Sequence, residues 1–150
     1  MKKQNISRIS ENHRRTISVR LSLLDEILCE YERIANGEEN RGVMYEEENT
    51  LSNKQRIRLK QTISEIREII SQIKETLFLK PKKENLANKI WSSASSLWEV
   101  LVETESKYLK GYGEVPESLA EFLDPKVKEI TRHLTSIVEI MRKTDAAKEF

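Results

Sequence analysis

The sequence predicts an all-α protein: an up-and-down antiparallel four-helix bundle with a short extra helix before the last helix. Apolar residues recur at helical spacing in four separate stretches, and polar or glycine- and proline-containing clusters divide these stretches. Only 4 Gly and 3 Pro occur among 150 residues, too few for the many turns of an all-β fold. A three-helix core with a loosely docked last helix is the alternative architecture.

The first helix is expected to start near Ser7 or Ser10 and to end at Asn36-Gly37, where glycine can adopt a left-handed conformation past the last turn. An acidic loop is expected over residues 38–50. Its apolar middle, residues 43–45, is expected to attach the loop to the bundle.

The second helix has the clearest pattern. Six apolar residues follow each other at gaps of 4, 3, 4, 3 and 4, which is a heptad seam of the kind that packs helix against helix. They are Leu59, Ile63, Ile66, Ile70, Ile73 and Leu77. Ser52 and Gln55 have the spacing of a capping box at the start of this helix. Lys80 and Pro81 end it, so it is expected to run to about Leu79.

The third helix is expected over residues 84–110, with Gly111-Tyr112-Gly113 as its terminator. Small residues fill the stretch from Trp91 to Trp98, which suits the close approach of another helix. The two tryptophans fall on the apolar stripe of this helix, and core packing is the commoner use of such a stripe.

The last part of the chain is expected to contain two helical elements. Residues 116–123 would form one or two turns, the short extra helix. Asp124 would then cap the last helix, with Pro125 at its first position. The last helix is expected to fray after Lys143.

These elements are expected to form one domain over residues 1–150, with a flexible basic tail at 1–6 and a frayed C-terminus at 144–150. Cys29 is the only cysteine, which excludes a disulfide within the chain and a Cys-based zinc site. No stretch approaches the ~20 apolar residues of a membrane span, and the N-terminus lacks the apolar core of a signal peptide. We therefore expect a cytoplasmic protein with no membrane partner.

No cofactor or metal site is expected. A di-iron carboxylate bundle needs two Glu-x-x-His motifs, but neither His13 nor His133 lies three residues after a glutamate. Glu105, Glu129 and His133 come nearest to a mononuclear site, yet a helix-surface pair and a glutamate at the bundle end explain the same residues. The chain also lacks a Gly-x-Ser-x-Gly nucleophile motif and a glycine-rich phosphate loop.

One short motif resembles the signature of a known enzyme family. Residues Arg8-Ile9-Ser10-Glu11-Asn12-His13 spell Arg-x4-His, which is similar to the catalytic motif of the HEPN ribonucleases, themselves helical bundles. The resemblance covers six residues of the chain. It implies that Arg8 would hold the scissile phosphate and that His13 would act as acid or base.

Charge is distributed in blocks along a chain whose formal net charge is only +1. In an antiparallel bundle, basic residues early in the second helix lie beside acidic residues late in the first, and we expect them to pair: Lys54, Arg56, Arg58 and Lys60 with Asp25, Glu26, Glu30 and Glu32. One end of the bundle is expected to carry a basic pole without such partners. Its residues are Arg8, Arg14, Arg15, Lys80, Lys82, Lys83, Arg142 and Lys143.

These patterns favour a non-enzymatic interaction or adaptor protein that acts through protein partners or self-association. The alternative is a nucleic-acid-associated accessory protein that uses the basic pole. A HEPN-like ribonuclease or a metal-binding bundle is the third hypothesis.

Overall fold

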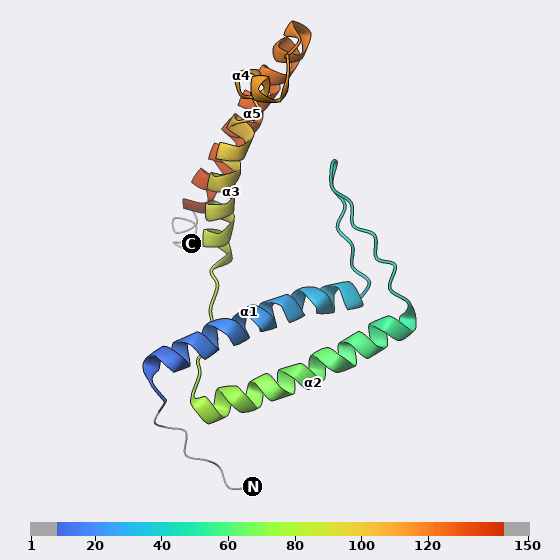
Figure 1. The fold of residues 1–150 in the computed structure, drawn as a ribbon, viewed down its shortest axis with the longest axis vertical. Coiled ribbons are helices and arrows are strands. Elements are labelled where there is room, and N and C mark those ends of the chain that lie inside the picture. The colour runs from blue at the N-terminus through green and yellow to red at the C-terminus, as the bar shows by residue number, and fades with distance from the viewer. Residues whose placement is uncertain (1–8, 143–150) are drawn as a thin grey trace, which may run out of the picture. The chain divides into compact units, whose positions relative to one another are not determined.

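A computed structural model describes residues 9–142 and confirms the all-α class, with four long helices and a short helix before the last (Figure 1). The expected tail at 1–6 and the frayed end at 144–150 lie outside the described residues. The chain divides into two compact units, Met1–Lys83 and Glu84–Phe150. The expectation of a single domain over 1–150 stays a prediction. No helix within residues 9–142 is long and apolar enough to span a membrane.

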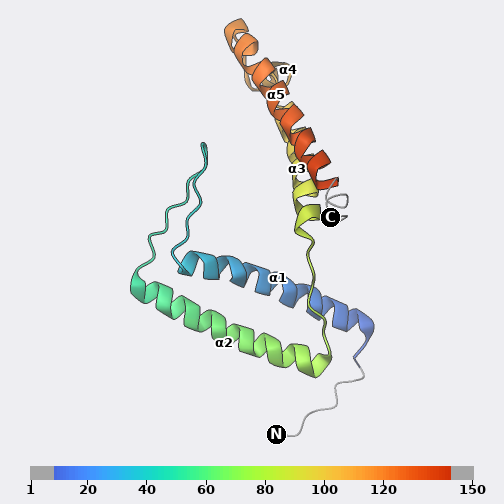
Figure 2. The ribbon, with the colours of Figure 1, turned by 180° about the vertical axis from the view of Figure 1, so that it is seen from behind.

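The first unit is an antiparallel hairpin of α1 (Glu11–Ala35) and α2 (Asn53–Leu77), seen from two sides in Figures 1 and 2. Ser10 is the N-cap of α1, because its hydroxyl accepts a 3.1 Å hydrogen bond from the backbone N–H of His13. The capping box of α2 is confirmed: Ser52 and Gln55 each accept a bond from the other's backbone N–H.

Both helices end beside a residue in the left-handed backbone region. Gly37 has φ +85, a left-handed conformation that favours glycine, and a Cβ there would displace the guanidinium of Arg56, whose Nη1 would lie 2.8 Å away. Helix α2 ends at Leu77, two residues before the expected end, because Phe78 adopts a left-handed φ of 55. The N–H of Leu79 then bonds back to the carbonyl of Lys74 at 2.9 Å, which closes the last turn.

The heptad seam of α2 faces α1. All six seam residues are buried or half-buried, and Ile63 is only 2% exposed. Leu28 and Ala35 are the buried residues of α1, and Ile17 and Leu21 of the same apolar stripe are half-buried, whereas Leu24 and Tyr31 are exposed. The buried part of this stripe and the seam of α2 form the core of this unit.

The second unit pairs α3 (Leu86–Val102) with α5 (Glu117–Arg142). The buried residues are Ala94 of α3 and Val127 and Thr131 of α5. The small side chain of Ala94 permits the close approach that the sequence predicted for this part of α3.

The predicted third helix over residues 84–110 is too long. It ends at Val102, because the N–H groups of Thr104 and Glu105 turn back in short i→i+3 bonds to Leu101 and Val102. A separate short helix follows, α4 (Ser106–Leu109), which continues into the 3₁₀ turn η1 (Lys110–Tyr112).

The predicted break before Pro125 is wrong, and so is the placement of the short helix at residues 116–123. Helix α5 runs through Pro125 without interruption, at the cost of the hydrogen bond that Pro125 cannot donate to the carbonyl of Glu121. Asp124 does not cap α5. Its carboxylate accepts bonds of 2.8 Å from the N–H and 2.6 Å from the hydroxyl of Ser106, so it closes the start of α4.

Candidate interaction surfaces

Part of the predicted basic pole forms a groove where α1 begins and α2 ends. The groove has a volume of about 520 Å³, and its lining residues are Glu11, Arg14, Arg15, Ser18, Phe78, Leu79 and Lys80. Arg14 is already engaged there. Its Nε donates to the carbonyl of Leu77 at 2.8 Å, and its Nη1 pairs with Glu11 at 2.8 Å. Arg14 therefore closes the end of α2, and Arg15 and Lys80 remain as the cations of this groove.

The other predicted residues of the basic pole do not line this groove. Lys82 lies with Lys80 in a second groove against α1, and Lys83 is exposed at the end of the first unit. Arg142 is the last residue of α5, in the second unit. Arg8 and Lys143 lie outside the described residues.

One side of the α1–α2 hairpin is closed by ion pairs centred on Arg67. Its guanidinium is 2.7 Å from Glu32 and 3.4 Å from Asp25, and it donates to Sγ of Cys29 at 3.4 Å. We call this the polar side. Within residues 9–142 no ion pair joins the basic residues of 54–60 to an acid, so that predicted pairing is wrong. Arg67 pairs with the acidic residues of α1 instead, because it lies next to the seam, between Ile63 and Ile70.

The opposite side of the hairpin is apolar. On α2, Ile69 lies three residues after Ile66 and four before Ile73, so it flanks the other edge of the seam from Arg67. On α1, Ile27 is placed in the same way between Leu24 and Tyr31. Because Arg67 bridges the polar edges of both helices, the remaining edges share one side. This apolar side consists of Leu24, Ile27, Tyr31, Ile66, Ile69 and Ile73.

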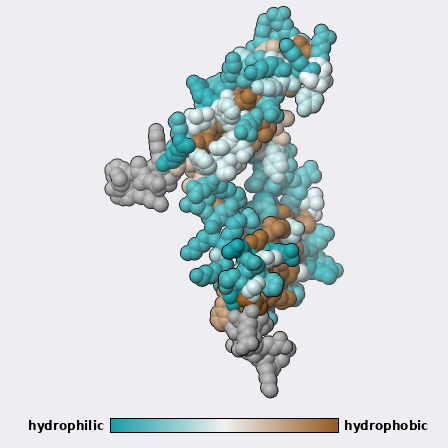
Figure 3. All heavy atoms as spheres, turned by 60° about the vertical axis from the view of Figure 1, so that its left-hand side comes forward, coloured by the Kyte–Doolittle hydropathy of each residue, from teal (hydrophilic) through white to brown (hydrophobic). Residues whose placement is uncertain are grey.

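Much of the apolar side is exposed. Ile69 is 55% exposed and Tyr31 46%, whereas Ile63 between the helices is 2% exposed. Figure 3 shows hydrophobic atoms gathered on the α1–α2 hairpin, in the lower part of the picture. Two helices can bury only one stripe each, and the apolar arc of α1 and α2 is wider than that stripe.

The acidic loop is an ordered arm rather than a segment attached to the helices. Arg41 and Glu46 form an antiparallel bridge, and the N–H of Gly42 bonds to the carbonyl of Tyr45 at 2.7 Å. Val43 and Met44 at the tip are 98% and 95% exposed. The expectation that they attach the loop to the bundle is wrong, because the paired backbone carries the tip away from the hairpin (Figures 1 and 2).

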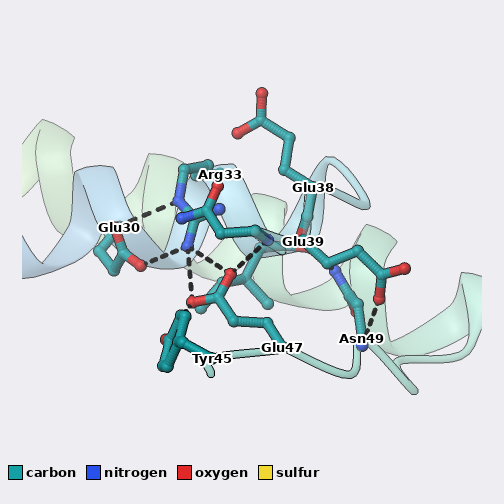
Figure 4. Close-up of polar contacts among 9 residues, drawn as sticks. Glu30, Arg33, Glu38, Glu39, Tyr45, Glu47 and Asn49 are labelled. Carbon is teal, nitrogen blue, oxygen red and sulfur yellow. Dashed lines mark hydrogen bonds and ion pairs between the residues drawn. The ribbon is translucent and has the colours of Figure 1, made fainter. Parts of the chain in front are cut away.

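The base of the arm is tied to α1 through Glu47 (Figure 4). Its carboxylate accepts bonds from the hydroxyl of Tyr45 at 2.7 Å and the N–H of Asn40 at 2.8 Å, and it lies 3.3 Å from Arg33. These donors hold the pKa of Glu47 below its ordinary value, the Tyr45 hydroxyl most strongly. The same bond raises the pKa of Tyr45. Arg33 also pairs with Glu30 at 2.6 Å.

Asn49 forms the second tie of the arm. Its side-chain N–H₂ donates to the carbonyl of Ile34 at 2.7 Å and to that of Glu38 at 3.1 Å. Its backbone N–H donates to the carboxylate of Glu39 at 2.9 Å. Polar contacts thus fix both ends of the arm at its base, a role of Arg33 and Asn49 that sequence reasoning missed. Single polar residues in a loop carry no spacing signal that would predict it.

The described residues hold no group of three His, Cys, Asp or Glu that could bind a metal ion. Glu129 lies 3.8 Å from Arg132, and Glu105 lies 4.0 Å from Lys107. His13 is exposed in the first turn of α1, and its supposed partner Arg8 lies outside the described residues. The ribonuclease and metal-binding hypotheses stay predictions.

The second unit also exposes apolar side chains beside its core. Trp91 and Trp98 are about two-fifths exposed on one flank of Ala94, and Ile90 and Leu97 are similarly exposed on the other. Comparison with known proteins adds no relative: no family model, curated protein or solved structure matches the chain. Inference about function therefore depends on these surfaces alone.

Proposed function

We propose that this protein is a non-enzymatic interaction protein and that the apolar side of the α1–α2 hairpin binds a protein partner. The observation that carries this proposal is the difference between the two sides of the hairpin. The polar side is closed by the pairs of Arg67 with Asp25 and Glu32, and the other side leaves isoleucines such as Ile69 in solvent.

Physical chemistry supports a binding role for this side. Burying apolar surface gains about 25 cal/mol per Å², and contiguous apolar patches on soluble proteins commonly mark interaction sites. The apolar side lies on two helices that their shared seam holds in place. A helix of a partner can therefore pack against the apolar side without reordering the chain.

The test compares two exposed isoleucines of the same helix. Ile69→Asp alters the apolar side, and Ile57→Asp is the matched control, because Ile57 is 66% exposed but lies away from the apolar side. Quantitative affinity purification should recover proteins with the wild type and the Ile57 variant that are lost with the Ile69 variant. Identical recovery by both variants would contradict the proposal.

The second candidate is a nucleic-acid-associated accessory protein, which the placement of Arg15 and Lys80 in one groove favours. Phosphate contacts release counterions, so binding to a short RNA or DNA should weaken steeply as salt rises. Lys80→Glu/Lys82→Glu/Lys83→Glu should abolish binding. Lys54→Glu/Arg58→Glu/Lys60→Glu, an equal charge change at exposed positions of α2, should not. No binding by the wild type at low salt would remove this candidate.

A further inference from the structure

A different surface of the first unit carries a groove lined by apolar side chains and lysines. We propose that the arm (residues 38–50) of one copy docks in the groove between α1 and residues 80–82 of another copy, and that the two copies exchange arms reciprocally. This inference goes beyond the proposed function, because neither the arm tip nor this groove belongs to the apolar side of the hairpin.

The receiving groove combines an apolar wall with a basic rim. It has a volume of about 420 Å³. Val19 and Leu23 supply the apolar wall, and Val19 is 62% exposed. Lys80 and Lys82 supply the cations, and Ser18, Ser22 and Glu26 complete the lining. The groove therefore suits a ligand with an apolar end and negative charge behind it.

The arm has the complementary chemistry. Val43 and Met44 form an almost fully exposed apolar tip, small enough to enter a groove of this size. Behind the tip, Glu46 and Glu48 are exposed carboxylates that have no ion pair within 4.0 Å among the described residues. The bonds of Glu47 and Asn49 order the base of the arm before it binds, which reduces the entropy cost of docking.

The occupant is a second copy because the ordered arm points away from the groove of its own chain. The arm leaves the hairpin where α1 ends at Ala35, and Ser22 in the groove is 13 residues earlier, about 20 Å along the helix. In both ribbon views the arm projects from the hairpin end and does not return along α1 (Figures 1 and 2). A twofold pair of chains places each arm near the other's groove and closes the assembly.

The first experiment measures the association of the full chain by sedimentation velocity over a series of protein concentrations at low salt. We expect the wild type to form a dimer, and Val43→Ser/Met44→Ser to weaken dimerisation at least tenfold. Ile57→Ser is the matched control. It also removes an exposed apolar side chain, but Ile57 belongs neither to the arm nor to the groove. Circular dichroism should show unchanged folding, since the tip side chains make no packing contact that folding needs.

A charge exchange tests the pairing directly. Lys80→Glu/Lys82→Glu should weaken the dimer, and adding Glu46→Lys/Glu48→Lys to the same chain should restore it. Glu26→Lys should strengthen the dimer, because it removes a like charge from the path of the acidic arm.

Two results would overturn the inference. One is a wild type that stays monomeric at every concentration. The other is a dimer that the tip variant leaves intact. If Ile69→Asp abolishes that dimer, the two copies associate through the apolar side of the hairpin. The arm inference is then wrong, whereas the apolar side keeps its proposed role as a binding surface.

Discussion

Individual polar residues decide where the helices of this protein begin, end and face. Arg14 of α1 bonds to the carbonyl of Leu77 at the end of α2. Asp124 of α5 caps the start of α4. Arg67 pairs with Glu32 and thereby determines which side of the hairpin is polar. Each acts on a segment remote in sequence. Their roles follow from the partner that the fold supplies, so residue type and local pattern do not reveal them.

Ile63 should be the residue on which the first unit depends most. Because it is 2% exposed, Ile63→Ala leaves a cavity between the helices. We expect a loss of about 2–5 kcal/mol in the free energy of unfolding, a large part of the ~5–15 kcal/mol typical of a domain. Urea denaturation measures it, with Ile57→Ala expected to cost about 0.5 kcal/mol or less. Equal losses in both variants would show that the seam is not the core.

Asp124 should hold the start of α4. The hydroxyl and backbone N–H of Ser106 lower the pKa of its carboxyl group, so the charged form is the one that caps the helix. Asp124→Asn removes the charge with little change of shape and should make amide hydrogen exchange at Ser106 several-fold faster. Glu121→Gln, at an exposed position of the same helix, is the control. Unchanged exchange at Ser106 would mean that α4 does not need this cap.

At the scale of elements, the arm differs most from what the sequence indicates. Composition marks residues 38–50 as a polar connection, and an ordered loop with one antiparallel bridge and an apolar tip is found instead. The order comes from polar ties to the last turn of α1, chiefly through Arg33 and Asn49 (Figure 4). Helix and arm therefore form one ordered element.

The arm should lose order at low pH. The pKa of Glu47 is lowered in the folded protein, so its contacts stabilise the arm above the ordinary glutamate pKa of about 4.3. That stabilisation is lost as pH falls through the lowered native pKa. Carboxyl-carbon NMR titration should also show that Tyr45→Phe raises the pKa of Glu47, because it removes the strongest donor. An unchanged pKa in that variant would contradict the assignment of the Tyr45 bond.

At the scale of the whole molecule, the two units have small cores. The first buries Leu28, Ala35, Ile63 and Leu79, and the second buries Ala94, Val127 and Thr131. A unit of fewer than 100 residues that buries so little apolar surface is only marginally stable when it is separated from the rest of the chain.

The prediction of a single domain can be tested with the two halves. If residues 1–150 fold as one domain, fragments 1–83 and 84–150 should each lose the cooperative thermal transition of the full chain, because neither core suffices alone. Circular dichroism during heating measures this. A fragment that unfolds cooperatively at the temperature of the full chain would show that its unit is a domain in its own right.

The sequence was sufficient for features that depend on neighbours along the chain. The heptad of α2, the capping box at Ser52 and the glycine end of α1 are local, since helix periodicity and capping involve residues three or four apart. These rules placed the four long helices. They missed the end of α3 at Val102, where local i→i+3 bonds replace the α-helical pattern, and the continuity of α5 through Pro125, which overrides the local preference for a break.

The candidate surfaces were less predictable. Charge pattern placed Arg14, Arg15 and Lys80 in one predicted pole, and these three residues line one groove, but the pattern did not show that Arg14 is engaged by Leu77 and Glu11. The sequence by itself determined that there are four long helices, the caps at Ser10 and Ser52, and the apolar seam of α2. Only the tertiary structure decided which edge of that seam Arg67 closes, which edge stays open and where the arm points. Those outcomes depend on pairs of residues that are distant in the chain and adjacent in space, and no local spacing encodes such pairs.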